Sequence, residues 1–163
     1  MPSLAKNEDR RTALLSEEAA KKLIEYLRRF EFATRTHALV ELLWETGMRI
    51  GAAHSIDVDD YNREEQYIEL HHRPQQGTRL KNKVDGERFV TLSPAVCDSL
   101  DAYLQYNRIE AEDDAGRSPL FTSRYGRVAT TSLRDSIYRI SRPCQYTGEC
   151  PHDRQIDSCE AME

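Results

Sequence analysis

The N-terminal part of the chain has apolar residues at the spacing of α-helices. Those in the range 20–30 recur on one face, and Ser16 stands ahead of them as a suitable N-cap. A second apolar stretch opens near Thr34 or Thr36 and stops at Gly47, and its apolar positions surround most of the helix circumference. The pattern therefore predicts an amphipathic helix with one buried face, followed by a helix at the centre of the fold.

Between residues 67 and 92, apolar and polar residues alternate as they do in β-strands. Residues 67–71 and 88–92 are the two candidate strands, and Asp85-Gly86 between them is a turn signal. We expect a small antiparallel hairpin or three-stranded sheet over 67–92, with basic residues on the connecting segment.

Helices dominate the rest of the predicted fold. Ser93 is a suitable N-cap and Pro94 a suitable first-turn residue for a helix that runs to about Ile109. A last helix is expected over 130–140, with Pro143 ending it. The expected fold class is α+β, mainly helical with a small antiparallel β-sheet or hairpin.

The chain of 163 residues is long enough for one domain with its own core. We expect a charged leader over 1–15, a folded domain over 16–142 and a Cys/His-rich tail over 143–163. Trp44 is expected in the core, since it belongs to the helix predicted to be central. No apolar run approaches the length of about 20 residues that a membrane span needs, and the first residues lack the apolar segment of a secretory signal. The sequence thus predicts a cytoplasmic protein without a membrane partner.

Charge is unevenly distributed along the chain. Lys and Arg total 23 against 28 Asp and Glu, so the net charge of -5 is opposite in sign to that of most nucleic-acid-binding proteins. In segment 71–88 basic residues outnumber acidic ones, and a second group of arginines follows within 124–142. Contact with phosphate needs only a local basic face, so nucleic acid stays among the candidate partners. The basic residues of segment 71–88 are Arg73, Arg79, Lys81, Lys83 and Arg88.

Short motifs stand in a defined order along the chain. Residues 46–50 read TGMRI directly after the second apolar helix, residues 57–59 read DVD, and residues 87–94 read ERFVTLSP before the next helix. This series, with the basic segment between its second and third members, resembles the first half of the catalytic domain of the tyrosine recombinases, or phage integrases. The resemblance covers about residues 16–142. It implies the fold of that domain, double-stranded DNA as a partner, and DNA recombination or integration as the activity.

Arg49, in the first motif, is the residue that the resemblance assigns to the phosphate under attack. A guanidinium offers two parallel donors to the non-bridging oxygens, on which charge builds up, and a lysine lacks that geometry. The alternative is a surface arginine that pairs with Glu45 or Asp57. The resemblance implies that catalysis requires no cofactor.

The resemblance also selects a proton donor for the departing 5′ oxygen. This donor is Lys83, which stands five residues before Arg88, with Lys81 in reserve. The same segment is expected to contact DNA through Arg73, Arg79, Lys81 and Arg88. The alternative is a solvated basic turn with no role in catalysis.

Other parts of the family pattern are absent from these 163 residues. Ala52 stands where many relatives carry an orienting Glu or Asp, no His is followed by Arg three residues later, and no Tyr lies beyond Tyr146. Because the H-x-x-R motif and the nucleophilic Tyr are missing, we expect an incomplete catalytic domain that is inactive by itself. It would act with a full-length recombinase or by self-association on DNA. The competing hypotheses are a non-catalytic DNA-binding or regulatory protein derived from a recombinase, and a zinc-bearing interaction domain.

The C-terminal residues bring together potential metal ligands. Cys144, Cys150, His152 and Cys159 form a Cys3His set suited to tetrahedral zinc, and the turn-rich sequence between them would gain folding energy from the metal. Free or disulfide-linked thiols are the alternative. Structural zinc is therefore a hypothesis for the tail.

Overall fold

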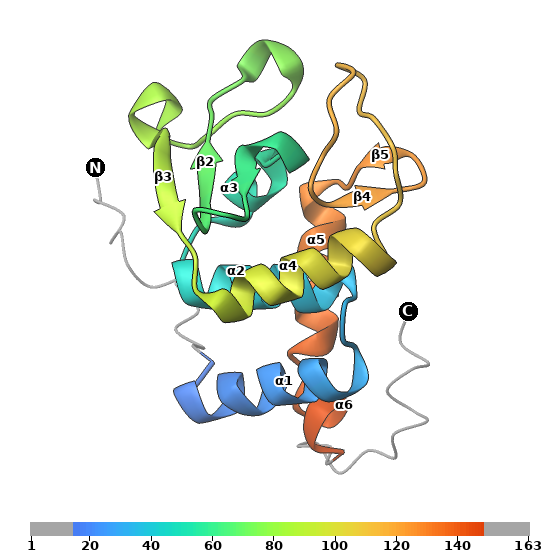
Figure 1. The fold of residues 1–163 in the computed structure, drawn as a ribbon. Coiled ribbons are helices and arrows are strands. Elements are labelled where there is room, and N and C mark those ends of the chain that lie inside the picture. Colours follow the sequence, from blue (N-terminus) through green and yellow to red (C-terminus); the bar gives the residue numbers. More distant parts are fainter. Residues whose placement is uncertain (1–14, 149–163) are drawn as a thin grey trace, which may run out of the picture.

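Helices are the main secondary structure of residues 15–148, the part of the chain that the computed structural model describes (Figure 1). Small antiparallel sheets and 3₁₀ turns complete it, which confirms the mainly helical α+β class. Within these residues no helix is long and apolar enough to span a membrane. The α-helices are α1 (Glu17–Phe30), α2 (Arg35–Thr46), α3 (Ile50–Ser55), α4 (Pro94–Tyr106), α5 (Thr130–Ile140) and α6 (Pro143–Thr147).

The predicted helix ends are confirmed where they depend on one or two local residues. Ser16 accepts a hydrogen bond from the Ala19 N–H (3.2 Å) at the start of α1, and Ser93 accepts one from the Val96 N–H (3.4 Å) at the start of α4. Gly47 follows α2 in the left-handed conformation, with φ of 60°, which glycine adopts without strain.

Helix boundaries differ from the prediction in two places. The helix that begins at Pro94 ends at Tyr106, before the predicted Ile109. Pro143 does not only end α5, because it also begins α6, where a proline suits the first turn. Residues 143–147, which the sequence assigned to the tail, thus include a helix whose Tyr146 packs against buried residues of α1.

The main sheet has the antiparallel order β1-β2-β3. Its strands are β1 (Tyr61–Asn62), β2 (Tyr67–Leu70) and β3 (Arg88–Thr91), and Ile68 faces Val90 across the β2-β3 pair. The predicted pairing of the last two is confirmed, whereas the third strand, β1, precedes the predicted range. A second, two-stranded sheet was not predicted, because strands as short as β4 (Thr122–Ser123) and β5 (Gly126–Arg127) leave no alternating pattern in the sequence.

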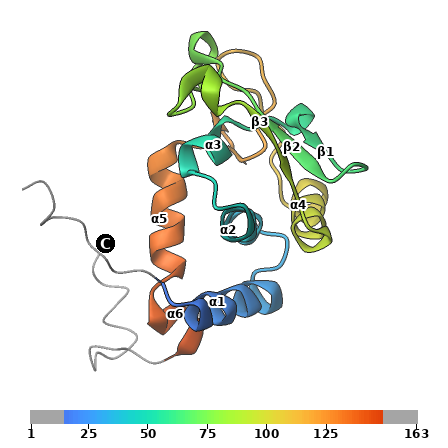
Figure 2. The same cartoon turned by 90° about the vertical axis from the view of Figure 1, so that its left-hand side faces the viewer.

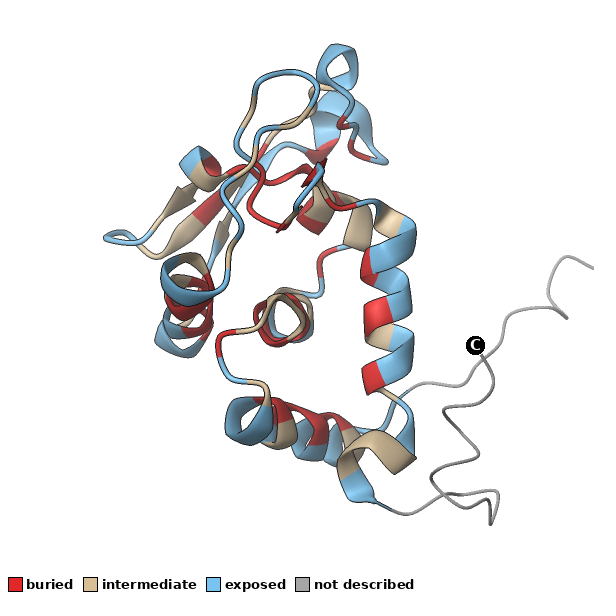
Figure 3. Ribbon diagram, turned by 90° about the vertical axis from the view of Figure 1, so that its right-hand side faces the viewer, coloured by how far each residue is buried: buried red, intermediate tan, exposed pale blue. Residues whose placement is uncertain are grey.

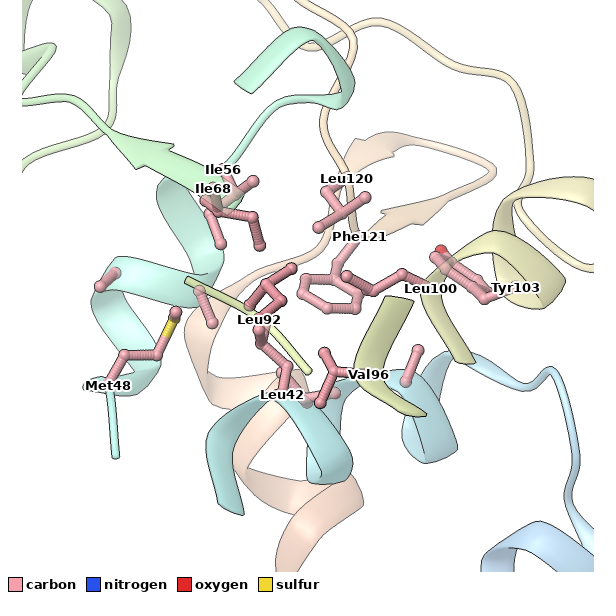
Figure 4. Close-up of a cluster of buried hydrophobic side chains, with 14 of the residues drawn as sticks. Leu42, Met48, Ile56, Ile68, Leu92, Val96, Leu100, Tyr103, Leu120 and Phe121 are labelled. Atoms are coloured by element: carbon pink, nitrogen blue, oxygen red, sulfur yellow. The ribbon is translucent and has the colours of Figure 1, made fainter. Parts of the chain in front are cut away.

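Helix α2 lies at the centre of the fold, as its apolar pattern predicts. Figure 2 shows it end-on, with α1, α4, α5 and the sheet around it. Six consecutive residues of α2, from His37 to Leu42, are buried. The main core joins α2 to α3, β2, α4 and the segment around Phe121 (Figure 4). A smaller core lies between α1, Val40 and Ile140, and α5 turns its buried side inward (Figure 3).

The prediction that Trp44 lies in the core is wrong. Its side chain is 47% exposed, although it belongs to the central helix. Neighbouring elements cover the last turn of α2 less completely than the turns before it, and Glu45 beside Trp44 is exposed as well. An apolar pattern around a helix therefore does not guarantee burial at its end.

Several acidic side chains are held in their charged form inside the fold. Burial raises the pKa of Glu41, but hydrogen bonds from His37 and Arg28 outweigh this effect and the pKa lies below its usual value. Burial also raises the pKa of Asp60 and Asp113. The hydrogen bonds that both carboxylates accept outweigh this effect, so both pKa values lie below the usual value. Asp60 receives its bonds from Arg73 and the Asp57 N–H, and Asp113 from backbone N–H groups and Arg127.

Acid is therefore expected to destabilise the fold. Glu41, Asp60 and Asp113 have lower pKa values in the folded protein than in the unfolded chain, so the unfolded chain binds protons first as the pH falls. Their contribution is complete above a pH of about 5 and is lost progressively below about 4. Urea unfolding at a series of pH values would measure this loss. A free energy of unfolding that stays constant between about pH 6 and pH 3 would contradict it.

Candidate functional site

Arg49 stands on a short segment that two helices hold in place. Gly47 turns the chain out of α2, and Met48 anchors the segment in the core with 5% of its side chain exposed. The Met48 N–H donates to Thr46 Oγ1 (3.3 Å), and the Thr46 hydroxyl in turn donates to the Leu42 carbonyl (2.6 Å). Arg49 then caps the N-terminus of α3, with its own side chain exposed. Its backbone is therefore fixed while its guanidinium is accessible.

A cleft of about 1110 Å³ lies beside this segment. Its walls come from three parts of the chain that are distant in sequence, namely the start of α3, the segment between β2 and β3, and the first turns of α5. The residues that line the cleft are Gly47, Met48, Arg49, Ile50, Gly51, Ala52, His72, Pro74, Arg79, Leu80, Lys81, Asn82, Lys83, Gly86, Arg88 and Arg134.

The cleft is strongly cationic. Among residues 15–148, its lining includes four arginines and two lysines and no Asp or Glu, although the whole chain has a net charge of -5. Clefts with walls of one charge concentrate the electrostatic field, so counter-ions of the opposite sign gather there. The cationic side chains are Arg49, Arg79, Lys81, Lys83, Arg88 and Arg134.

Most of these cationic side chains have no partner among residues 15–148. The exception is Arg88, whose guanidinium donates to the Gly86 carbonyl (3.1 Å). Arg49 pairs with neither of the acids considered from the sequence. Glu45 accepts from the backbone N–H of Ser93 (2.6 Å) and from its hydroxyl, and Asp57 binds other arginines. The donors of Arg49 are therefore available to a ligand.

The segment between β2 and β3 forms the second wall of the cleft. The Leu80 N–H donates to His72 Nδ1 (2.9 Å), and the His72 N–H donates to Glu87 (2.8 Å), so the two ends of the segment are joined to each other and to its middle. Lys83 has a positive φ of 54° where it begins a 3₁₀ turn (Lys83–Gly86). Both Lys81 and Lys83 line the cleft, and the geometry keeps both as candidates for the proton donor.

The structure separates Arg73 from the other predicted DNA contacts. Arg79, Lys81 and Arg88 line the cleft, but Arg73 does not. Its guanidinium donates twice to Asp60 (2.7 and 2.8 Å) and once to Asp57 (3.1 Å). These bonds raise the pKa of Arg73, with the Asp60 hydrogen bonds as the largest cause. Arg73 is thus turned toward carboxylates of its own chain.

Arg134 and His72 line the cleft but were not among the predicted site residues. Arg134 follows the buried Leu133 on α5 and lies on the exposed part of that helix. The amphipathic pattern of α5 distinguishes its buried side from its exposed side. It contains no information about which other segment the exposed side approaches.

Comparison with known proteins identifies the family. The sequence model of the phage integrase family matches residues 13–147. The chain belongs to the phage integrase family. None of the curated proteins compared with it matches.

Two solved structures have the fold of this phage integrase domain. The first is the crystal structure of XerA recombinase, with a TM-score of 0.64 and 26% sequence identity, covering 85% of this chain and 45% of that one. The second is the integrase of the Tn1549 transposon in complex with a circular intermediate DNA. Its TM-score is 0.66 at 14% identity, covering 88% of this chain and 48% of that one. The chain thus spans less than half the length of either structure.

The departure at Ala52 has a clear setting in this phage integrase domain. Ala52 is 8% exposed, lies in α3 and lines the cleft. Within residues 15–148 the lining of the cleft contains no Asp or Glu, so this part of the chain provides no carboxylate in the cleft to orient Arg49.

The predicted zinc site lies largely outside the described residues. Of its candidate ligands, Cys144 is in α6, is partly exposed and forms no disulfide with another residue of the described range. Cys150, His152 and Cys159 are outside residues 15–148. Within that range, no group of three or more His, Cys, Asp or Glu side chains is arranged to hold a metal ion. Structural zinc in the tail stays a prediction.

Proposed function

We propose that the cleft binds the sugar-phosphate backbone of double-stranded DNA, as the phosphate-binding half of a recombinase or integrase site. One observation supports this most directly: six cationic side chains line one cleft, to which the described part of the chain contributes no Asp or Glu. Phosphate contacts supply most of the affinity of proteins for DNA and require such a local basic surface. The Tn1549 integrase, which has the same fold, was solved in complex with DNA.

Within this site, Arg49 and Lys83 have different roles. Arg49 donates to the non-bridging oxygens of one phosphate, on which negative charge increases during strand exchange. Its fixed backbone and its guanidinium, which has no partner among residues 15–148, suit that role. Lys83, with Lys81 in reserve, lies on the opposite wall and would protonate the departing 5′ oxygen.

The covalent step requires groups that these 163 residues do not supply. No H-x-x-R motif is present, and no Tyr follows Tyr146. We therefore propose that these residues bind the phosphate without cleaving the strand by themselves, and that the nucleophile is supplied from outside them. A non-catalytic regulator that occupies DNA through the same cleft is the second candidate function, favoured by Ala52 in place of an orienting acid.

Replacing Arg49 tests the cleft directly. Arg49→Ala is expected to weaken binding of a labelled duplex by about tenfold to a hundredfold at low salt, because charge-assisted hydrogen bonds to phosphate are lost. Fluorescence anisotropy measures the affinity. Arg63→Ala is the matched control, since Arg63 is also an exposed arginine but lies outside the cleft, paired with Asp101 (2.8 Å). Equal losses in both variants, or no binding by the wild-type chain, would refute the proposed site.

A further inference from the structure

We propose that a buried ionic network centred on Asp57 positions two walls of the cleft relative to each other. These two walls are the start of α3 and the segment between β2 and β3. This inference rests on the proposed DNA-binding function and adds residues that do not contact the DNA. We call these residues the Asp57 network, and its members are Asp57, Asp60, Asp113, Arg73, Arg117 and Arg127. None of them lines the cleft.

Asp57 is the centre of this network. Its residue is 7% exposed, and its carboxylate accepts hydrogen bonds from three guanidinium groups. Oδ2 accepts from Arg73 (3.1 Å) and Arg117 (2.7 Å), and Oδ1 accepts from Arg127. A single carboxylate therefore joins the β2-β3 segment to the loop that contains Arg117 and to β5.

Arg117 spans the gap between the two walls. On one side its Nη2 donates to the Ser55 carbonyl (3.2 Å) at the end of α3. On the other side its Nη1 donates to Thr78 Oγ1 (2.9 Å) and to the Gln76 carbonyl (3.2 Å), directly before Arg79. The planar fork of one guanidinium thus connects α3, whose N-cap is Arg49, to the segment that contributes Arg79, Lys81 and Lys83.

Arg127 fixes the same end of α3. Its Nη1 donates to the carbonyls of His54 (2.7 Å) and Ile56 (3.3 Å), and its Nε donates to Asp113 (2.9 Å). Because α3 has only six residues, or about 9 Å of length, restraining its C-terminal end also restrains its N-terminal cap, Arg49. The second wall is restrained in parallel, since Arg73 is held by Asp60.

The charge balance favours a positioning role over direct attraction of DNA. The network contains three carboxylates and three guanidinium groups, so its formal charge is zero. Buried ion pairs contribute little net stability compared with apolar packing, but their directional bonds select one geometry. Here that geometry is the separation between Arg49 and the basic segment opposite it.

Arg117→Lys tests this role because the substitution keeps the charge and removes the fork. An ammonium group cannot reach Asp57, Ser55 and Thr78 together with the geometry of a guanidinium. We expect affinity for a labelled duplex to fall about fivefold at a temperature where circular dichroism shows the variant folded. In the Arg49→Ala background, Arg117→Lys should lower the affinity for the duplex by less than about twofold. The reason is that Arg49, one of the groups that the network positions, is already absent.

The control is Arg108→Lys, in which the same change is made at another partly buried arginine. Arg108 donates to the Pro119 carbonyl (3.0 and 3.1 Å) and belongs to neither the network nor the cleft. It should leave affinity unchanged. A loss for Arg117→Lys that is the same in both backgrounds, or no loss at all, would overturn the positioning role.

Hydrogen exchange separates a failure of the network from a failure of DNA binding. Arg117→Lys should raise amide exchange in residues 50–56 and 73–80 together, and Arg108→Lys should not. If exchange rises in both segments but the wild-type chain does not bind DNA, the network survives as a coupling of the two walls and the proposed function fails. If exchange in the two segments is unchanged, the network proposal fails whatever the affinity.

Discussion

Raising the monovalent salt concentration from about 50 to about 200 mM is expected to weaken binding of duplex DNA by roughly a thousandfold. Each phosphate that a protein neutralises releases condensed counter-ions, and the cleft presents six cationic side chains. If all of them contact phosphates, the logarithm of the association constant should fall with the logarithm of salt with a slope of about -5. Anisotropy titrations at four or more salt concentrations give this slope.

Two single substitutions test whether the slope comes from contacts in the cleft. Arg49→Ala should make it shallower by about one, since one phosphate contact is lost, and Arg63→Ala should leave it unchanged. A wild-type slope shallower than about -2 would mean that most of the cationic side chains in the cleft do not contact DNA.

Asp57→Asn is expected to lower the free energy of unfolding by about 3 to 5 kcal/mol. The substitution removes the charge that Arg73, Arg117 and Arg127 share, and leaves three buried or half-buried guanidinium groups with two carboxylates. The amide also replaces one acceptor oxygen by a donor, which faces other donors. Urea unfolding followed by circular dichroism measures the change.

Asp59→Asn is the matched control for this prediction. Asp59 lies two residues along the chain, is exposed and makes no side-chain bond among residues 15–148. Its replacement should change the free energy of unfolding by no more than about 0.5 kcal/mol. Similar changes in the free energy of unfolding for Asp57→Asn and Asp59→Asn would show that the hydrogen bonds of Asp57 do not stabilise the fold.

The charge of the cleft differs in sign from the net charge of the chain. The chain is acidic overall, and some of its acids are used internally, as in the Asp57 network. The residues within 15–148 that line the cleft include no Asp or Glu, so the formal charge of this lining is positive while that of the whole chain is negative. The basic segment in the sequence indicated this distribution, because local charge density is visible along the chain.

The sequence alone determined the features that depend on near neighbours. Ser16, Ser93 and Gly47 predicted helix ends, since capping involves residues within one turn. Alternation predicted the β2-β3 pair, and the apolar pattern of α2 predicted its central position. The resemblance of the TGMRI motif to the family pattern singled out Arg49, and the structure places this residue at the cleft.

Only the tertiary structure decided which distant side chains share a site. It brought Arg134 of α5 to the cleft, turned Arg73 away toward Asp57 and Asp60, and left Trp44 exposed at the end of the central helix. These outcomes depend on contacts between segments far apart in the chain, whose packing no local pattern specifies. Arg73 looked like the other basic residues of its segment in sequence, and it differs from them because carboxylates from an earlier turn lie within hydrogen-bonding distance in the fold.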